Sequence, residues 1–220
     1  MNIKRNIPVF PAVAVLLFSL LLSTAKAQEV DNEFQLRTEF KATYKPTKKL
    51  KISLNPELRF DETFTVDKYH IEGIASYKVF KFLSVDAGYR FIGNPRDGKT
   101  TQYFNSYLLG FSAKKSFDRF QSSIRVRYTN YADDEITDKK FLRYKGELEY
   151  NIKGCKITPF VAVEAFQQLS DNALYKMRYV AGAEYKIVKN NYIGINYKLD
   201  YYLLEAVNRH IINLSYKINF

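Results

Sequence analysis

The sequence is poor in the residues that build disulfides, metal sites and membrane-spanning helices. Its 220 residues include one cysteine and two histidines. A single cysteine, Cys155, excludes a disulfide within the chain. Beyond the amino-terminal region, no apolar run approaches the length of about 18 residues that indicates a transmembrane helix. Metal-ligand spacings, a G-x-S-x-G motif and a phosphate-binding glycine loop are also missing, so we predict no metal and no cofactor.

The chain has no block of charge of one sign. It carries 34 lysines and arginines against 23 aspartates and glutamates, for a formal net charge of +11. A basic chain can indicate nucleic-acid binding, but that function normally gathers the charges in a patch or stripe. Here the charges are spread evenly along a chain with the features of an exported protein. We therefore expect no nucleic-acid partner.

The amino-terminal region has the three parts of a secretory signal. Lys4 and Arg5 precede the apolar run VFPAVAVLLFSLLLS, and TAKA follows with the small residues Ala25 and Ala27. The apolar run is short for a membrane span of about 20 residues, which favours cleavage over anchoring. We expect a signal peptide over residues 1–27, a single domain over residues 28–220, and export through the periplasm.

The rest of the chain alternates between apolar and polar residues. The stretch EFQLRTEFKATYK places Phe34, Leu36 and Phe40 on one face and Arg37 and Glu39 on the other. A period of two over such a length indicates a long strand. Soluble strands usually have about 5 or 6 residues, whereas a tilted strand needs about 9–11 to cross a bilayer. Eleven such segments are predicted, at residues 33–45, 50–61, 68–79, 83–93, 102–114, 118–131, 140–152, 155–167, 175–188, 191–203 and 208–220.

The connections between these segments alternate in length. PTKK, FKF and KNN are short, while DETFTVD, GNPRDGKTT and ADDEITDK are longer. Short periplasmic turns and longer external loops are typical of outer-membrane barrels, and bacterial single-chain barrels have an even number of strands. We predict an all-β fold, a single transmembrane antiparallel up-and-down β-barrel of about 10–12 strands, with ten or twelve preferred over eleven.

Alternation alone does not tell which face of the strands meets lipid, and a soluble barrel with an apolar interior is the alternative. Strand length and aromatic placement favour an apolar outer wall, with Leu109 toward lipid and Leu108 toward the lumen. Aromatic belts of outer-membrane barrels lie at headgroup level. The predicted outer belt is Phe60, Tyr69, Phe91, Tyr103, Tyr128, Tyr144, Tyr175 and Tyr201, and the inner belt is Tyr44, Tyr77, Phe120, Tyr150, Tyr185 and Phe220.

The last residues, LSYKINF, repeat the alternation with Tyr216, Ile218 and Phe220. This ending is similar to the C-terminal signal of outer-membrane barrels, which the insertion machinery reads. We expect all three side chains to face lipid. Outer-membrane lipid and the barrel insertion machinery are the expected partners, and the outer membrane is the expected location.

Several stretches carry a resemblance to a known family, namely LNPELRFDE, AGYRFIG, RVRYTNY, KITPFVAVEAF and YKINF. They resemble an uncharacterised family, a domain of unknown function, of small outer-membrane barrel proteins of Bacteroidetes-type bacteria. The resemblance covers essentially the whole mature chain. It implies the barrel fold and carries no activity, because the family has none assigned.

The face opposite the apolar wall is heavily ionised, with both signs interleaved. The candidate lumen charge network is Arg59, Glu72, Asp86, Arg90, Arg125, Arg127, Glu147, Glu149, Glu164, Arg178 and Glu184. Arg59 and Arg90 are expected near Glu72 and Asp86 on neighbouring strands. Long side chains largely fill a lumen of this size, and paired charges satisfy each other there. We expect a structural protein or a narrow, blocked pore of unknown substrate, with a solute-selective channel as the alternative.

A lipid-modifying enzyme is a further alternative, because some outer-membrane barrels carry a Ser/His site at the lipid-facing rim. His70 is predicted to face the lumen, and His210 to face lipid near the outer rim. The stretch RHIINLS has no serine two residues after His210, and Ser215 falls on the opposite face. We therefore expect no catalytic residue and no enzymatic activity.

Overall fold

The computed structural model describes residues 31–96, 98–130 and 139–220, and every regular element in these ranges is a β-strand. The predicted signal peptide lies outside the described residues. Within them, no helix has the length and apolarity to cross a membrane. The strands are β1 (Asp31–Tyr44), β2 (Leu50–Phe60), β3 (Val66–Lys78), β4 (Leu83–Arg96), β5 (Lys99–Phe117), β6 (Phe120–Thr129), β7 (Phe141–Tyr150), β8 (Ile157–Gln168), β9 (Leu174–Val188), β10 (Asn191–Tyr202) and β11 (Val207–Asn219).

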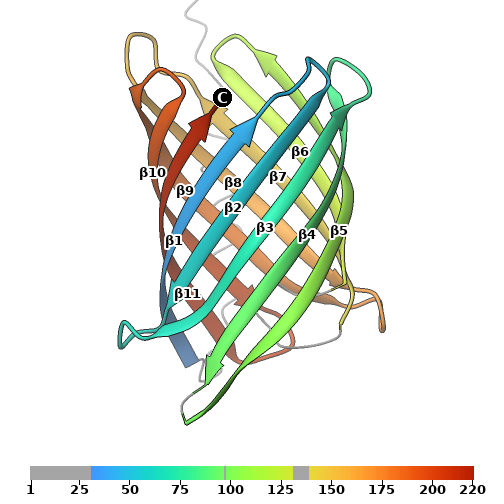
Figure 1. The fold of residues 1–220 in the computed structure, drawn as a ribbon, viewed down its shortest axis with the longest axis vertical. Helices are drawn as coiled ribbons and strands as arrows, with labels where there is room; N and C mark the ends of the chain where they lie inside the picture. The colour runs from blue at the N-terminus through green and yellow to red at the C-terminus, as the bar shows by residue number, and fades with distance from the viewer. Residues whose placement is uncertain (1–30, 97, 131–138) are drawn as a thin grey trace, which may run out of the picture. The chain divides into compact units, whose positions relative to one another are not determined.

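All eleven strands form the wall of one closed barrel (Figure 1). Each strand pairs antiparallel with its neighbour in sequence, and β1 pairs parallel with β11 from Asp31↔Val207 to Thr43↔Asn219. The preference for ten or twelve strands is therefore wrong. In an odd-numbered series of alternating strands the first and last run in the same direction, so the barrel closes through one parallel ladder. Stacked rings support this seam, with centroids 5.0 Å apart for Phe34 and His210 and 5.8 Å for Phe40 and Tyr216.

The barrel has two ends that differ in their connections. We call the turn end the one reached by the connections after β1, β3, β5, β7 and β9, and the loop end the opposite one. The turn end is at the top of Figure 1, where β1 and β11 both finish. Phe220 lies there, and its N–H donates to the Thr43 carbonyl oxygen at 2.8 Å.

One predicted loop is a continuation of the wall. The stretch GNPRDGKTT belongs largely to β4 and β5, which stay paired to Arg96↔Lys99. Gly98 has a φ of 65°, a conformation that glycine adopts at little cost, so the chain reverses within a tight turn. The Arg96 guanidinium donates to the Thr100 carbonyl oxygen at 2.9 Å. The β4–β5 hairpin consequently projects beyond the neighbouring strands at the loop end (Figure 1).

The two faces of the wall are opposite in character to those of a soluble barrel. Leu109 is 59% exposed on the outside, whereas its neighbour Leu108 is 2% exposed in the lumen, as predicted. Arg37, Arg59 and Asp200 are fully buried on the lumen side, while Phe34, Leu54 and Ile195 are exposed. Charged residues thus fill the interior and apolar residues cover the exterior.

Aromatic residues lie near both ends of the outer wall. Phe91, Tyr103 and Tyr201 are exposed toward the loop end, and Tyr44 and Tyr185 toward the turn end. Tyr175 departs from the predicted outer belt, because it is buried. A bulge between Phe166 and Gln167 shifts the β8–β9 register at this point, and the phase extrapolated along β9 no longer holds.

Candidate functional site

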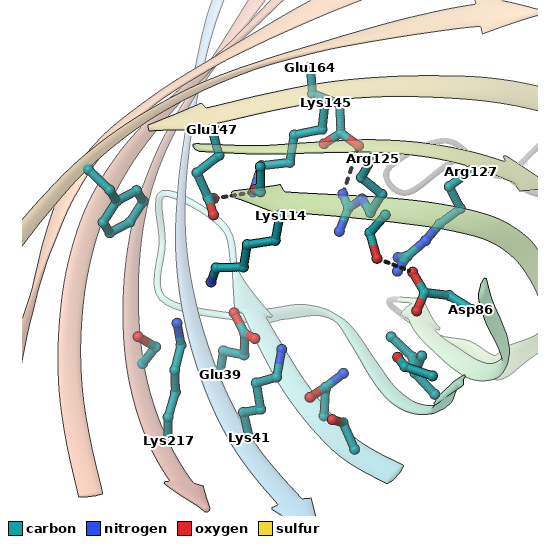
Figure 2. Close-up of a pocket in the computed structure, with 18 of the residues that line it drawn as sticks. Glu39, Lys41, Asp86, Lys114, Arg125, Arg127, Lys145, Glu147, Glu164 and Lys217 are labelled. Carbon is teal, nitrogen blue, oxygen red and sulfur yellow. Dashed lines mark hydrogen bonds and ion pairs between the residues drawn. The ribbon is translucent and has the colours of Figure 1, made fainter. Parts of the chain in front are cut away.

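The lumen contains a cavity of about 810 Å³ that is rich in charge. Thirteen lysines and arginines and eight aspartates and glutamates line it. The lining reaches the exposed residues Lys78 and Lys81 at the rim of the turn end. Figure 2 shows charged side chains from several strands extending into the cavity, among them Lys41, Arg125 and Lys217. The cavity is therefore a polar space that opens at the turn end.

The structure brings the predicted network residues together on the lumen side of the wall. Ten of the eleven line the cavity, and Arg59 is buried farther toward the loop end. Arg90 pairs with Glu72 across β3 and β4 at 2.5 Å, the cross-strand contact expected from the sequence. Arg59 donates to Glu57 at 2.6 Å, and Asp86 accepts from Ser112 at 2.9 Å.

Two lumen carboxylates, Glu57 and the network residue Glu164, each contact more than one basic side chain. Glu57 is 2.6 Å from Arg59, 3.9 Å from Arg37 and 3.8 Å from His70. Glu164 on β8 binds Arg125 at 3.0 Å and Arg143 at 3.1 Å. Sharing of this kind compensates buried carboxylates well. The cavity lining as a whole has fewer acidic residues than basic ones.

Nearer the turn end, the ion pairs are partly solvated. Lys145 pairs with Glu147 at 2.6 Å, Lys114 with Glu149 at 3.6 Å, and Lys217 with Glu184. The side chains of Lys145 and Glu147 are 24% and 21% exposed. Such pairs are screened by water and contribute little to stability.

Toward the loop end, side chains fill the lumen. We call this cluster the plug, which consists of Phe141, Phe166, Tyr175, Lys176, Arg178, Asp200 and Tyr202. Its members are 0–5% exposed. Asp200 accepts from Arg178 at 2.5 and 2.6 Å and from Lys176 at 3.2 Å. The plug is thus a compensated charge set packed among aromatic rings in the loop half of the lumen.

Aromatic faces also cover the plug cation Lys176 and the neighbouring Arg143. The Lys176 ammonium lies 4.7 Å from the centroid of Phe166 and 4.9 Å from that of Tyr202. The Arg143 guanidinium lies 4.5 Å from the Phe166 centroid. Cation–π contacts of this kind strengthen when they are removed from water. Lys176 and Phe166 were not among the predicted network residues, although Lys176 precedes Arg178 by two positions and could have been found from that alternation.

The two histidines lie where the sequence predicts. His70 is buried in the lumen, and His210 lies on the outer face near the loop end. His210 Nδ1 is 2.6 Å from the Tyr197 hydroxyl, and Nε2 is 3.1 Å from Asn32 Oδ1. Ser215 lines the cavity on the opposite face. The described residues contain no group of three His, Cys, Asp or Glu side chains placed to hold a metal ion.

The terminal residues named as an insertion signal lie on the outer face. Tyr216 and Phe220 are exposed at the turn end, while Ser215, Lys217 and Asn219 line the cavity. The Tyr216 hydroxyl donates to Asn191 Oδ1 at 2.6 Å. Their orientation agrees with the predicted alternation, and their recognition by an insertion machinery stays a prediction.

The comparison with known proteins identifies a family but no activity. No curated protein matches the chain. A family model described as "Protein of unknown function (DUF2490)" matches residues 34–219, which spans the barrel from the fourth residue of β1 to the last residue of β11. The chain therefore belongs to this family of unknown function.

Proposed function

We propose that this protein is an outer-membrane barrel of Gram-negative bacteria whose lumen is blind, open toward the periplasm at the turn end and closed by the plug at the loop end. The observation that carries the proposal is the contrast between the plug, whose members are 0–5% exposed, and the cavity of about 810 Å³. A lumen closed in this way does not conduct ions freely.

The outer-membrane address is supported by the apolar outer wall with aromatic residues near both ends. If it is right, the protein fractionates with outer membranes and migrates faster on gels when unheated than when boiled. Recovery in the soluble periplasm without detergent would contradict it. The resemblance to small outer-membrane proteins of Bacteroidetes-type bacteria agrees with this address.

Bilayer conductance tests the blind lumen. The wild-type barrel is expected to give no sustained conductance steps. The double variant Phe166→Ala, Tyr202→Ala removes two rings of the plug and is expected to conduct. Phe160→Ala is the matched control, since it removes a ring that lines the open cavity instead. Sustained steps from the wild type would favour a solute-selective channel, and a closed double variant would show that the plug is not the barrier.

A lipid-modifying enzyme is the second candidate, and one observation favours it. His210 is held on the outer wall between the Tyr197 hydroxyl and Asn32, so one ring nitrogen is placed to accept the phenolic proton. Hydrolysis or acyl transfer on phospholipid that is lost in His210→Ala but retained in His70→Ala would establish this function. Absence of both activities in the folded wild type would eliminate it.

A further inference from the structure

On the lumen side of β6 and β7, basic residues lie directly opposite each other, and not all of them pair with an acidic residue. Arg127 lies directly opposite Arg143, and Arg125 lies directly opposite Lys145. Like charges at opposed positions of an antiparallel pair destabilise it. Glu164 is shared by Arg125 and Arg143, and Glu147 pairs with Lys145. Arg125, Arg143 and Lys145 thus each contact a carboxylate, whereas Arg127 forms no such pair among the described residues.

Arg127 is buried in the lumen and forms no close ion pair among the described residues. It is 6% exposed, lines the cavity, and its Nε atom has no hydrogen-bond partner. In the part of the chain that the structure describes, Arg127 forms no ion pair with an acidic side chain. A guanidinium offers five N–H donors, and burying this group without hydrogen-bond partners is unfavourable. The position is thus set up for a group that is both negatively charged and an acceptor of hydrogen bonds.

The space beside Arg127 is open to the cavity. Its register partner on β5 is Gly110, which contributes no side chain. A Cβ there would lie 2.3 Å from the Val126 carbonyl oxygen and 2.9 Å from the Arg127 Cα, so the close approach of β5 and β6 requires glycine. Figure 2 shows Arg127 and Arg125 extending into the same part of the cavity, with Asp86 nearby. Asp86 accepts from Ser112.

Other cations of the cavity also form no ion pair among the described residues. Lys41 and Lys198 are half-buried in the lining, and neither pairs with an acidic side chain. The lining has thirteen basic and eight acidic residues, so basic residues are in excess. Arg127, Lys41 and Lys198 are three of these basic residues. A cavity of about 810 Å³ lies within the range of roughly 300–1,000 Å³ that is typical of small-molecule sites.

We infer that the cavity binds a small soluble oxyanion, a phosphate ester or a polycarboxylate, with Arg127 as its central ligand and the turn end as its entrance. Arginine suits this role because its planar donors match phosphate and carboxylate oxygens two at a time. The inference rests on the proposed blind lumen, since a cavity closed at one end retains a solute that enters from the other.

Titration of the full mature chain, folded in non-ionic detergent, with inorganic phosphate, glycerol 3-phosphate and citrate tests the inference. Calorimetry at constant ionic strength is expected to detect binding to the wild type. Arg127→Gln is expected to weaken it at least about tenfold. Arg96→Gln, which removes an exposed guanidinium at the loop end, is expected to leave affinity unchanged. Equal affinity in Arg127→Gln, or no binding by the wild type, would overturn the inference.

Two further arms keep the result unambiguous. Arg127→Lys retains the charge but loses the planar donor pair, and is expected to bind with intermediate affinity; it also serves if Arg127→Gln does not fold. Lysophosphatidic acid in mixed micelles represents a lipid headgroup, and binding of this lipid alone would overturn the soluble-solute assignment.

The conductance and binding results together distinguish the two proposals. Wild-type conductance with Arg127-dependent binding would refute the plug and retain the site. A barrel that neither conducts nor binds would refute the site and retain the plug.

Discussion

The two halves of the lumen use the same strands but different chemistry. At the loop end, Lys176, Arg178 and Asp200 are removed from water and surrounded by aromatic rings. At the turn end, Lys145, Glu147 and Lys114 remain in contact with water. The difference teaches that an ionised lumen face does not by itself predict a pore. In the proposed blind lumen, the loop half is closed because its charges are compensated and covered by aromatic rings.

The largest expected effect comes from breaking the plug. Asp200→Asn removes the carboxylate that both Lys176 and Arg178 contact, so two buried cations lose the negative charge that they share. We expect a loss of about 3–5 kcal/mol in the free energy of unfolding, measured in detergent by urea titration. Glu147→Gln makes the same chemical change in the solvated half and is expected to lose at most about 1 kcal/mol. Equal losses would abolish the contrast between the halves.

The outer wall should not show this contrast, because apolar residues cover it over both halves. Leu109→Arg places a charge on the exposed apolar face of β5 and is expected to destabilise the barrel in lipid by about 2–4 kcal/mol. Leu109→Val, which keeps the site apolar, is the control. Unchanged stability of Leu109→Arg in lipid vesicles would mean that this face does not meet hydrocarbon.

Leu108 gives the complementary result for the lumen side. A Cβ on Gly88 would lie 3.0 Å from Leu108 Cγ, so Leu108 packs closely against the β4 backbone on the lumen side. We expect Leu108→Asn to be better tolerated in lipid than Leu109→Asn, because only the second places an amide against hydrocarbon. The reverse order of unfolding free energies would show that the assigned phase of β5 is wrong.

The smallest expected effect concerns the connections at the two ends. At the loop end, Asp61 Oδ1 accepts from the Thr63 hydroxyl at 2.7 Å and from the N–H groups of Thr63 and Thr65 at 2.9 Å each. The Thr63 hydroxyl bond, followed by the backbone bonds, lowers the pKa of the Asp61 carboxyl below its usual value. A lowered pKa stabilises the folded loop above the ordinary carboxyl pKa, and this contribution is lost as the pH falls through the folded value.

Corrected for intrinsic exchange, the protection of the Thr65 amide should therefore fall on acidification in the wild type and lose this pH dependence in Asp61→Ala. At the turn end, the Thr47 hydroxyl accepts from the Leu50 N–H at 2.9 Å and does not titrate in this range. Corrected for intrinsic exchange, protection of Leu50 should stay constant over the same pH interval. A parallel loss at both positions would indicate global rather than local opening.

Much of the barrel follows from alternation, and its departures have local causes. The exposed Leu109 and buried Leu108 are predictable because a strand has a strict period of two. The burial of Tyr175 is not, since the bulge near Phe166 resets that period. The parallel seam of β1 and β11 was not predicted, because we expected an even number of strands. That expectation is a rule about known barrels rather than a physical requirement.

The charge network was predictable as a face but not as a set of pairs. Arg90 and Glu72 are neighbours once the β3–β4 register is known. The sharing of Glu164 by Arg125 and Arg143, and the isolation of Arg127, depend on side-chain reach across the wall. The division of the lumen into a covered and an open half depends on which aromatic residues enter it, and alternation assigns Phe141 and Phe166 to the lumen without indicating that they meet.

Thiol labelling of two lumen serines tests the central claim that the loop half is closed and the turn half open. In a Cys155→Ser background, which removes the exposed native thiol, Ser123→Cys reports on the cavity and Ser106→Cys on the buried loop half. With a charged maleimide and the folded barrel, rapid labelling at 123 and protection at 106 until the protein is unfolded are predicted. Equal labelling at both positions in the folded barrel would contradict the account.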